Sequence, residues 1–173
     1  GKKSNKKIDF IDQLILIIFV YLIVGLLIST PFYLSNSNVT FMSAYFESIS
    51  GLTGTGFSTF DSIKYLDPTL ILWRSSSQWI GGLYFLFFII LIFSNKSFNF
   101  KMTNLTYTGE NILKSEQNVR DNILKIFIYY SVLSLIFLTL LNISGIRLFN
   151  SLNLTMTLVS GGGFLPSNNL SEI

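Results

Sequence analysis

The sequence contains neither cysteine nor histidine, and each absence excludes a class of chemistry. Without cysteine there are no disulfides, no thiolate nucleophiles and no sulfur-ligated zinc. Without histidine there is no imidazole to serve as a general acid or base. Because a serine or threonine nucleophile would need such an activating base, we expect the chain not to be an enzyme.

Charged residues are also scarce. They make up 12% of the 173 residues, whereas hydrophobic residues make up 50%. A soluble domain usually carries about 25% charged residues. With 17 phenylalanines and a mean hydropathy of +0.55, the composition is typical of a multi-pass membrane protein whose main partner is the lipid bilayer. The sequence has no nucleotide-binding motif of the GxGxxG or P-loop kind, and we expect no nucleic-acid partner.

Five apolar stretches of two different lengths predict the helices. Three are long enough to cross a bilayer, since a helix rises about 1.5 Å per residue and the hydrocarbon is roughly 30 Å thick: residues 14–34, 69–93 and 126–146. Two reach only about half that depth and run directly into glycines, which favours re-entrant helices: residues 41–52 and 150–160. We expect Pro31 to end the first span, because proline lacks the helical N–H donor.

Basic residues are placed asymmetrically around these spans. If the chain crosses at each long stretch, nine of them lie on one side: Lys2, Lys3, Lys6, Lys7, Lys96, Lys101, Lys114, Arg120 and Lys125. The positive-inside rule then puts the N-terminus and the 94–125 segment in the cytoplasm. Both glycine-rich loops consequently open to the outside.

The two glycine-rich loops repeat one pattern. Residues 52–57 and 159–164 both read aliphatic, hydroxyl, glycine, small, glycine, phenylalanine, and each copy follows a half-length helix that follows a full span. Such a loop suits a desolvated monovalent cation, because it presents neutral carbonyl and hydroxyl oxygens beside the negative end of a helix dipole. Neither loop contains the Asp or Glu that calcium and magnesium sites usually recruit. The competing interpretation is that the glycines are ordinary turn residues.

Three segments carry a resemblance to a known family: residues 46–56, 72–82 and 160–164. They resemble the two filter loops and the intervening helix of pore-forming subunits in the Trk/Ktr potassium uptake family, in its TrkH-like branch. That family folds as four helix–pore loop–helix repeats of potassium-channel type around one pore. The resemblance implies an all-α membrane protein, an N-terminal fragment with about one and a half to two of the four repeats.

The same resemblance implies a division of the chain into three parts. Residues 1–95 form the first helix–pore–helix repeat, residues 96–121 a cytoplasmic linker, and residues 122–173 the first helix and pore loop of a truncated second repeat. Repeats three and four are absent. Because half a ring cannot enclose a pore, we expect the fragment alone not to transport.

Eight residues correspond by this resemblance to two quarters of a potassium selectivity filter: Thr53, Gly54, Thr55, Gly56, Ser160, Gly161, Gly162 and Gly163. Gly56 and Gly163 stand at the family's filter glycine. Relatives with serine at that position of the first repeat tend to favour sodium, so Gly56 implies K⁺ as the transported ion. The resemblance implies no other cofactor.

Two charged residues near the first loop are candidate filter supports. Glu47 lies within the first half-length helix, where it attracts cations, braces the helix or is a solvated or hydrogen-bonded carboxylate near the interface. Arg74 lies near the outer end of the second span, where it pairs with Glu47 or Asp67, caps loop carbonyls or extends to the headgroups.

The resemblance further implies partners and a location. It implies a bacterial cytoplasmic (inner) membrane protein with a cytosolic nucleotide-binding regulatory subunit of the TrkA/KtrA-like kind, and a homodimer when full length. Two alternatives stay open. One is a non-conducting membrane scaffold or assembly subunit whose glycine loops only pack, and the other is a two-repeat cation channel subunit that dimerises.

Overall fold

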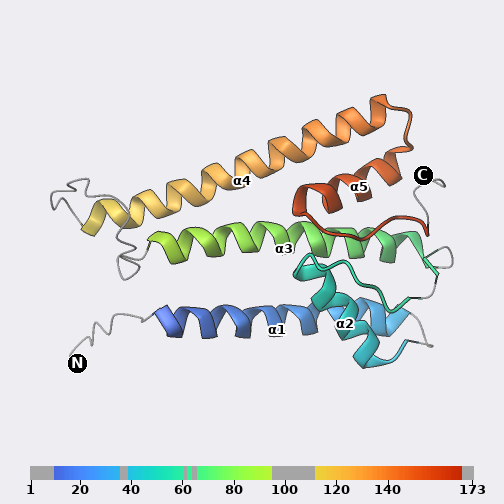
Figure 1. Ribbon diagram of the computed structural model, residues 1–173, viewed down its shortest axis with the longest axis horizontal. Helices are drawn as coiled ribbons and strands as arrows, with labels where there is room; N and C mark the ends of the chain where they lie inside the picture. The colour runs from blue at the N-terminus through green and yellow to red at the C-terminus, as the bar shows by residue number, and fades with distance from the viewer. Residues whose placement is uncertain (1–9, 36–38, 61, 64–65, 95–111, 169–173) are drawn as a thin grey trace.

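The computed structural model describes residues 10–35, 39–60, 62–63, 66–94 and 112–168, and within these residues helices are the only regular secondary structure (Figure 1). It contains five helices: α1 (Phe10–Ser35), α2 (Phe41–Leu52), α3 (Pro68–Ser94), α4 (Ile112–Ile143) and α5 (Leu148–Ser160). The long helices α1, α3 and α4 lie side by side with α3 in the middle. The short helices α2 and α5 pack on opposite sides of one half of α3.

Both short helices begin and end close to the expected residues. α2 covers residues 41–52 as expected, and α5 begins at Leu148 rather than at residue 150. The hydroxyl of Thr40 explains the start of α2, because it accepts a hydrogen bond from the Ser43 N–H at 3.2 Å as an N-cap. α4 begins at Ile112, within the segment assigned above to the linker.

Pro31 lies inside α1 and does not end the helix, so that expectation was wrong. A proline removes the N–H that would bond the carbonyl four residues earlier, here that of Leu27. The hydroxyl of Thr30 donates to this carbonyl at 2.7 Å, and the indole Nε1 of Trp73 in α3 donates to the next carbonyl, that of Ile28, at 3.0 Å. Neighbouring side chains thus supply donors around the proline, which lets the helix continue.

The start of α3 is defined by Asp67 and Pro68. The Asp67 carboxylate accepts hydrogen bonds from the hydroxyl and the N–H of Thr69, and Pro68 stands at the first helical position, where its missing N–H costs nothing. The Thr69 hydroxyl, and then the Thr69 N–H, lower the pKa of Asp67 below its usual value. Asp67 therefore serves as a helix cap.

Two helices are long and apolar enough to cross a membrane, over Ile11–Ser35 of α1 and Arg120–Ile143 of α4, judged by length and composition within the described residues. Only 11% and 6% of their most apolar stretches are buried within the chain, so most of their side chains face outward. α3 differs because its first half carries Arg74, three serines and Gln78. These polar residues lie where α2 and α5 pack against α3, which gives this half of α3 its own role.

Candidate functional site

The two glycine-rich loops, which are separated by about a hundred residues in the sequence, meet at one point. A Cβ atom built on Gly56 would lie 2.6 Å from Cα and 2.7 Å from N of Gly163. The reverse substitution would place a Cβ on Gly163 3.3 Å from Cα of Gly56. The structure therefore brings the two aligned glycines into backbone contact, at a separation that no side chain at Gly56 would permit.

The backbone of the loops also repeats in part. Gly54 and Gly161, which occupy the same position of the repeat, have φ angles of +68° and +71°. Gly56 has a φ of +76°, whereas its counterpart Gly163 lies outside this left-handed region. Three of these positions therefore need glycine for the backbone angle alone.

In the first loop the amide groups point back toward the half-length helix. The N–H groups of Thr55 and Gly56 both donate to the carbonyl of Ser50, at 3.0 and 3.4 Å, and the N–H of Gly54 donates to Gly51 at 3.0 Å. In contrast, the carbonyl oxygens of residues 53–56 and 160–163 accept no hydrogen bond from the described part of the chain. Eight neutral oxygens therefore have no hydrogen-bond donor among the described residues.

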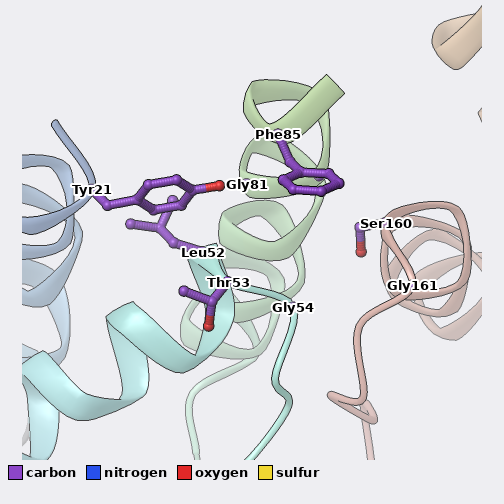
Figure 2. Close-up of a pocket in the computed structure, with 9 residues that line it drawn as sticks. Tyr21, Leu52, Thr53, Gly54, Gly81, Phe85, Ser160 and Gly161 are labelled. Atoms are coloured by element: carbon purple, nitrogen blue, oxygen red, sulfur yellow. The ribbon is translucent and has the colours of Figure 1, made fainter. Parts of the chain in front are cut away.

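A cavity of about 200 Å³ lies where the C-terminal ends of α2 and α5 approach each other (Figure 2). Thr53 and Gly54 line it from one side and Ser160 and Gly161 from the other, with Gly81 of α3 between them. Gly82 lines it as well. The C-terminus of a helix carries about half a negative charge. Two such ends facing one cavity make it favourable for a cation.

The hydroxyl groups beside this cavity are engaged as donors. Thr53 Oγ1 donates to the carbonyl of Ile49 at 2.8 Å and lies 2.7 Å from Thr55 Oγ1, and Ser160 Oγ donates to the carbonyl of Thr157 at 3.0 Å. A hydroxyl that donates in this way keeps acceptor lone pairs on its oxygen. Among the described residues no group of three His, Cys, Asp or Glu side chains could hold a metal ion, so these neutral oxygens are the donor set available.

Glu47 is buried and forms an ion pair with Arg74. Glu47 Oε1 lies 2.7 Å from Arg74 Nε, and the two side chains are 0% and 1% exposed. Of the alternatives for Arg74, the structure therefore shows pairing with Glu47 rather than with Asp67, and a side chain enclosed by helices rather than extended to the surface. Glu47 is likewise a buried, hydrogen-bonded carboxylate rather than a solvated one that is free to attract cations.

The remaining bonds of Glu47 reach the segment that leaves the first loop. The Ser58 hydroxyl donates to Oε1 at 3.0 Å, and the N–H of Thr59 donates to Oε2 at 2.9 Å. Arg74 Nη2 also donates to Ser58 at 3.2 Å. One end of the loop is thus tied to the other through a charged pair, which restricts the positions that residues 53–56 can take.

α3 contacts the second loop as well, through Arg74 and Gln78. The guanidinium of Arg74 lies 4.1 Å from the ring centre of Phe164, a cation–π contact. Gln78 is 0% exposed, and its amide satisfies both its ends in one orientation. Its oxygen then accepts from the N–H groups of Gly163 and Phe164 at 3.1 and 3.3 Å, and its nitrogen donates to Thr157 Oγ1 at 3.1 Å.

Small residues allow α3 to approach both half-length helices. A Cβ on Gly81 would overlap the backbone carbonyl of Leu52 at the end of α2. A Cβ on Gly82 would lie 2.8 Å from the hydroxyl of Tyr130 and 2.9 Å from Cβ of Ser160 at the end of α5. This glycine pair therefore permits close helix packing, with one glycine facing each half-length helix.

Three residues that hold the loops were not predicted from the sequence: Ser50, Gln78 and Phe164. The Ser50 hydroxyl donates to the carbonyl of Phe57 at 2.6 Å, which closes the first loop. A polar side chain within an apolar span costs free energy unless it has a hydrogen-bond partner. The position of Gln78 within such a span could therefore have identified it from the sequence. No comparable signal distinguished Phe164, which is 2% exposed, from its counterpart Phe57, which is 68% exposed.

Comparison with known proteins gives a consistent set of similarities. The family model described as TrkH, cation transport protein, matches residues 1–169. An uncharacterized cation transporter of Methanocaldococcus jannaschii is 33% identical over 152 residues, which cover 86% of this chain and 31% of that protein. The Trk system potassium uptake protein TrkG of Escherichia coli is 25% identical over 175 residues, covering 94% of this chain and 34% of that protein.

A solved structure has the same fold. The crystal structure of the potassium transporter TrkH from Vibrio parahaemolyticus superposes with a TM-score of 0.75 at 21% sequence identity, covering 96% of this chain and 32% of that one. The chain spans about a third of the length of these relatives.

Proposed function

The chain belongs to the TrkH family of cation transport proteins, and from this premise we propose that it supplies two of the loops of a potassium selectivity filter in a pore-forming membrane subunit. The proposed filter residues are the eight named from the sequence: Thr53, Gly54, Thr55, Gly56, Ser160, Gly161, Gly162 and Gly163. In the complete protein, K⁺ would exchange its water for their oxygens and pass down the membrane potential.

The observation that carries this proposal is the backbone contact between Gly56 and Gly163. It supports a shared axis for the two loops, because residues that an axis relates can touch only when they lie next to that axis. The unbonded carbonyl oxygens beside that contact support a role as ligands. Neutral oxygens suit a monovalent ion that must bind and then leave, and the nearest buried carboxylate, Glu47, is already neutralised by Arg74.

The scaffold alternative explains only part of the glycine pattern. It accounts for Gly81 and Gly82, whose missing side chains permit packing. It does not account for Gly161, whose Cβ would meet nothing within 4 Å, or for Gly54, whose Cβ would lie 3.8 Å from its nearest neighbour. These glycines do not serve packing, and their left-handed backbone angles support a loop shaped for its oxygens.

The remaining features of the proposal concern the complete protein. We propose that this chain contributes a repeat over residues 1–95, a linker over 96–121 and the truncated part of a second repeat over 122–173, with its N-terminus in the cytoplasm. The complete protein would lie in a bacterial cytoplasmic membrane as a homodimer and bind a cytosolic nucleotide-binding regulatory subunit. The adjacent ends of α3 and α4, both far from the loops, support one cytoplasmic side (Figure 1).

The variant Gly56→Ser tests the filter assignment in the complete protein. We expect K⁺ flux to fall and the preference for K⁺ over Na⁺ to drop about tenfold, because a left-handed residue with a side chain costs about 1–2 kcal/mol and its Cβ displaces Gly163. The measurement is ion flux and reversal potential in liposomes containing the purified protein.

The matched control for this variant is Gly145→Ser. Gly145 also has a positive φ, +90°, but its Cβ would meet nothing within 4 Å, and it lies in the turn before α5. The control therefore carries the same backbone strain away from the loops. An unchanged ion preference in Gly56→Ser, or an equal change in both variants, would count against the filter assignment.

A further inference from the structure

The two loops hold two aligned amide groups alike, by bonds to the half-length helix before each loop, and differ at the third. In the first loop, the N–H of Gly56 donates to the carbonyl of Ser50, in the half-length helix of its own repeat. In the second loop, the equivalent N–H, that of Gly163, donates to the side chain of Gln78, which belongs to α3 of the preceding repeat. The second loop therefore depends on a side chain from outside its own repeat.

A peptide unit is planar, so its N–H and C=O groups point in opposite directions. A hydrogen bond from the Gly163 N–H to Gln78 consequently turns the carbonyl of Gly162 away from α3. The bond from the Phe164 N–H turns the carbonyl of Gly163 in the same way. One side-chain oxygen thus sets the direction of two neighbouring carbonyl oxygens.

Gln78 is itself held in place from several directions. It is 0% exposed, its amide nitrogen donates to Thr157 Oγ1, and it fills the space that a side chain on Gly162 would need. Arg74, one helical turn earlier on the same face of α3, pairs with Glu47 and contacts Phe164. A single face of one helix therefore holds both loops.

We propose that Gln78 is a positioning residue for the second loop: it aims the carbonyl oxygens of Gly162 and Gly163 at the cation and keeps the second loop in register with the first. The proposal rests on the filter function proposed above. Gln78 does not touch the ion. It acts through the backbone of the loop, and it makes the geometry of one repeat depend on the helix of another.

Three substitutions in the complete protein separate the hydrogen bonds of Gln78. Gln78→Leu removes all of them at similar volume, and we expect the K⁺ over Na⁺ preference to fall about fivefold to tenfold, since two backbone amides lose their acceptor. Gln78→Glu keeps an oxygen for both amides, and we expect it to retain most of the preference. Thr157→Val removes only the partner of the amide nitrogen, so we expect a smaller change than with Gln78→Leu.

The readout is the reversal potential under mixed K⁺ and Na⁺ in liposomes, which a merely structural role would not move. Ser76→Ala is the matched control, because Ser76 contacts Met156 in α5 rather than the loop. If Gln78→Leu does not reach the membrane, Gln78→Glu is compared with Gln78→Asn, whose shorter side chain cannot span to the loop. A retained preference in Glu and a reduced one in Asn supports the proposal.

Two results would overturn this inference. The first is a wild-type ion preference in both Gln78→Leu and Gln78→Asn, together with a changed ion preference in Gly56→Ser. That result would contradict the role of Gln78 but not the filter function. The other is an equal loss in Gln78→Glu and Gln78→Asn. If Gly56→Ser itself leaves the ion preference unchanged, the filter function falls first and the role of Gln78 falls with it.

Discussion

Replacing Arg74 with methionine is expected to destabilise the complete protein by about 3–5 kcal/mol, the usual cost of breaking a buried ion pair. The variant leaves the Glu47 carboxylate, which is 0% exposed, without its cation. It also removes the donor to Ser58 and the cation–π contact with Phe164. The measurement is the unfolding midpoint and the monodisperse yield of the purified protein in detergent.

A double variant distinguishes the ion pair from simple loss of packing. Arg74→Met combined with Glu47→Gln removes both charges but keeps an oxygen to accept from Ser58 and Thr59. We expect it to recover at least about half of the lost stability, because no buried charge is left unpaired. Arg147→Met, at an exposed arginine before α5, should be close to wild type. A double variant less stable than Arg74→Met would contradict this account.

The second large effect is expected at Gly81. In Gly81→Leu the side chain would begin inside the backbone carbonyl of Leu52, at the last residue of α2. A backbone atom cannot yield as the end of a flexible side chain can, so the end of α2 must move away from α3. Overpacking in a close-packed interior costs about 1–3 kcal/mol or more, and here it also displaces Thr53, where the first loop begins.

We therefore expect Gly81→Leu to give much less folded protein than the wild type. We expect the protein that does fold to show no preference for K⁺ over Na⁺. The yield of monodisperse protein and the reversal potential in liposomes check the two parts separately. Ile80→Leu is the control, because Ile80 is the preceding residue of α3 and is 46% exposed. A wild-type yield in Gly81→Leu would mean that α2 and α3 are not in the tight contact described above.

The local parts of the structure followed from local features of the sequence. The bounds of α2 were predicted because a short apolar stretch runs directly into glycines, and the structure adds the Thr40 cap at its start. Pro31 was misjudged, because its effect depends on a distant donor, the Trp73 indole, as well as on the nearby Thr30 hydroxyl. The same limit applies to Gln78: its type was visible in the sequence, but its partners lie 85 and 86 residues further along, at Gly163 and Phe164.

By itself the sequence determined that the chain is apolar and helical and that it contains two copies of one glycine- and hydroxyl-containing loop, far apart in the sequence. These features could be predicted because composition, helix length and loop pattern are properties of neighbouring residues. Only the tertiary structure decided that Arg74 pairs with Glu47 rather than Asp67. It alone decided that Gly56 meets Gly163, and that α3 holds both loops. These contacts depend on which helices pack together. The distances between residues far apart in the sequence are set by the packing of the whole chain rather than by their spacing along it.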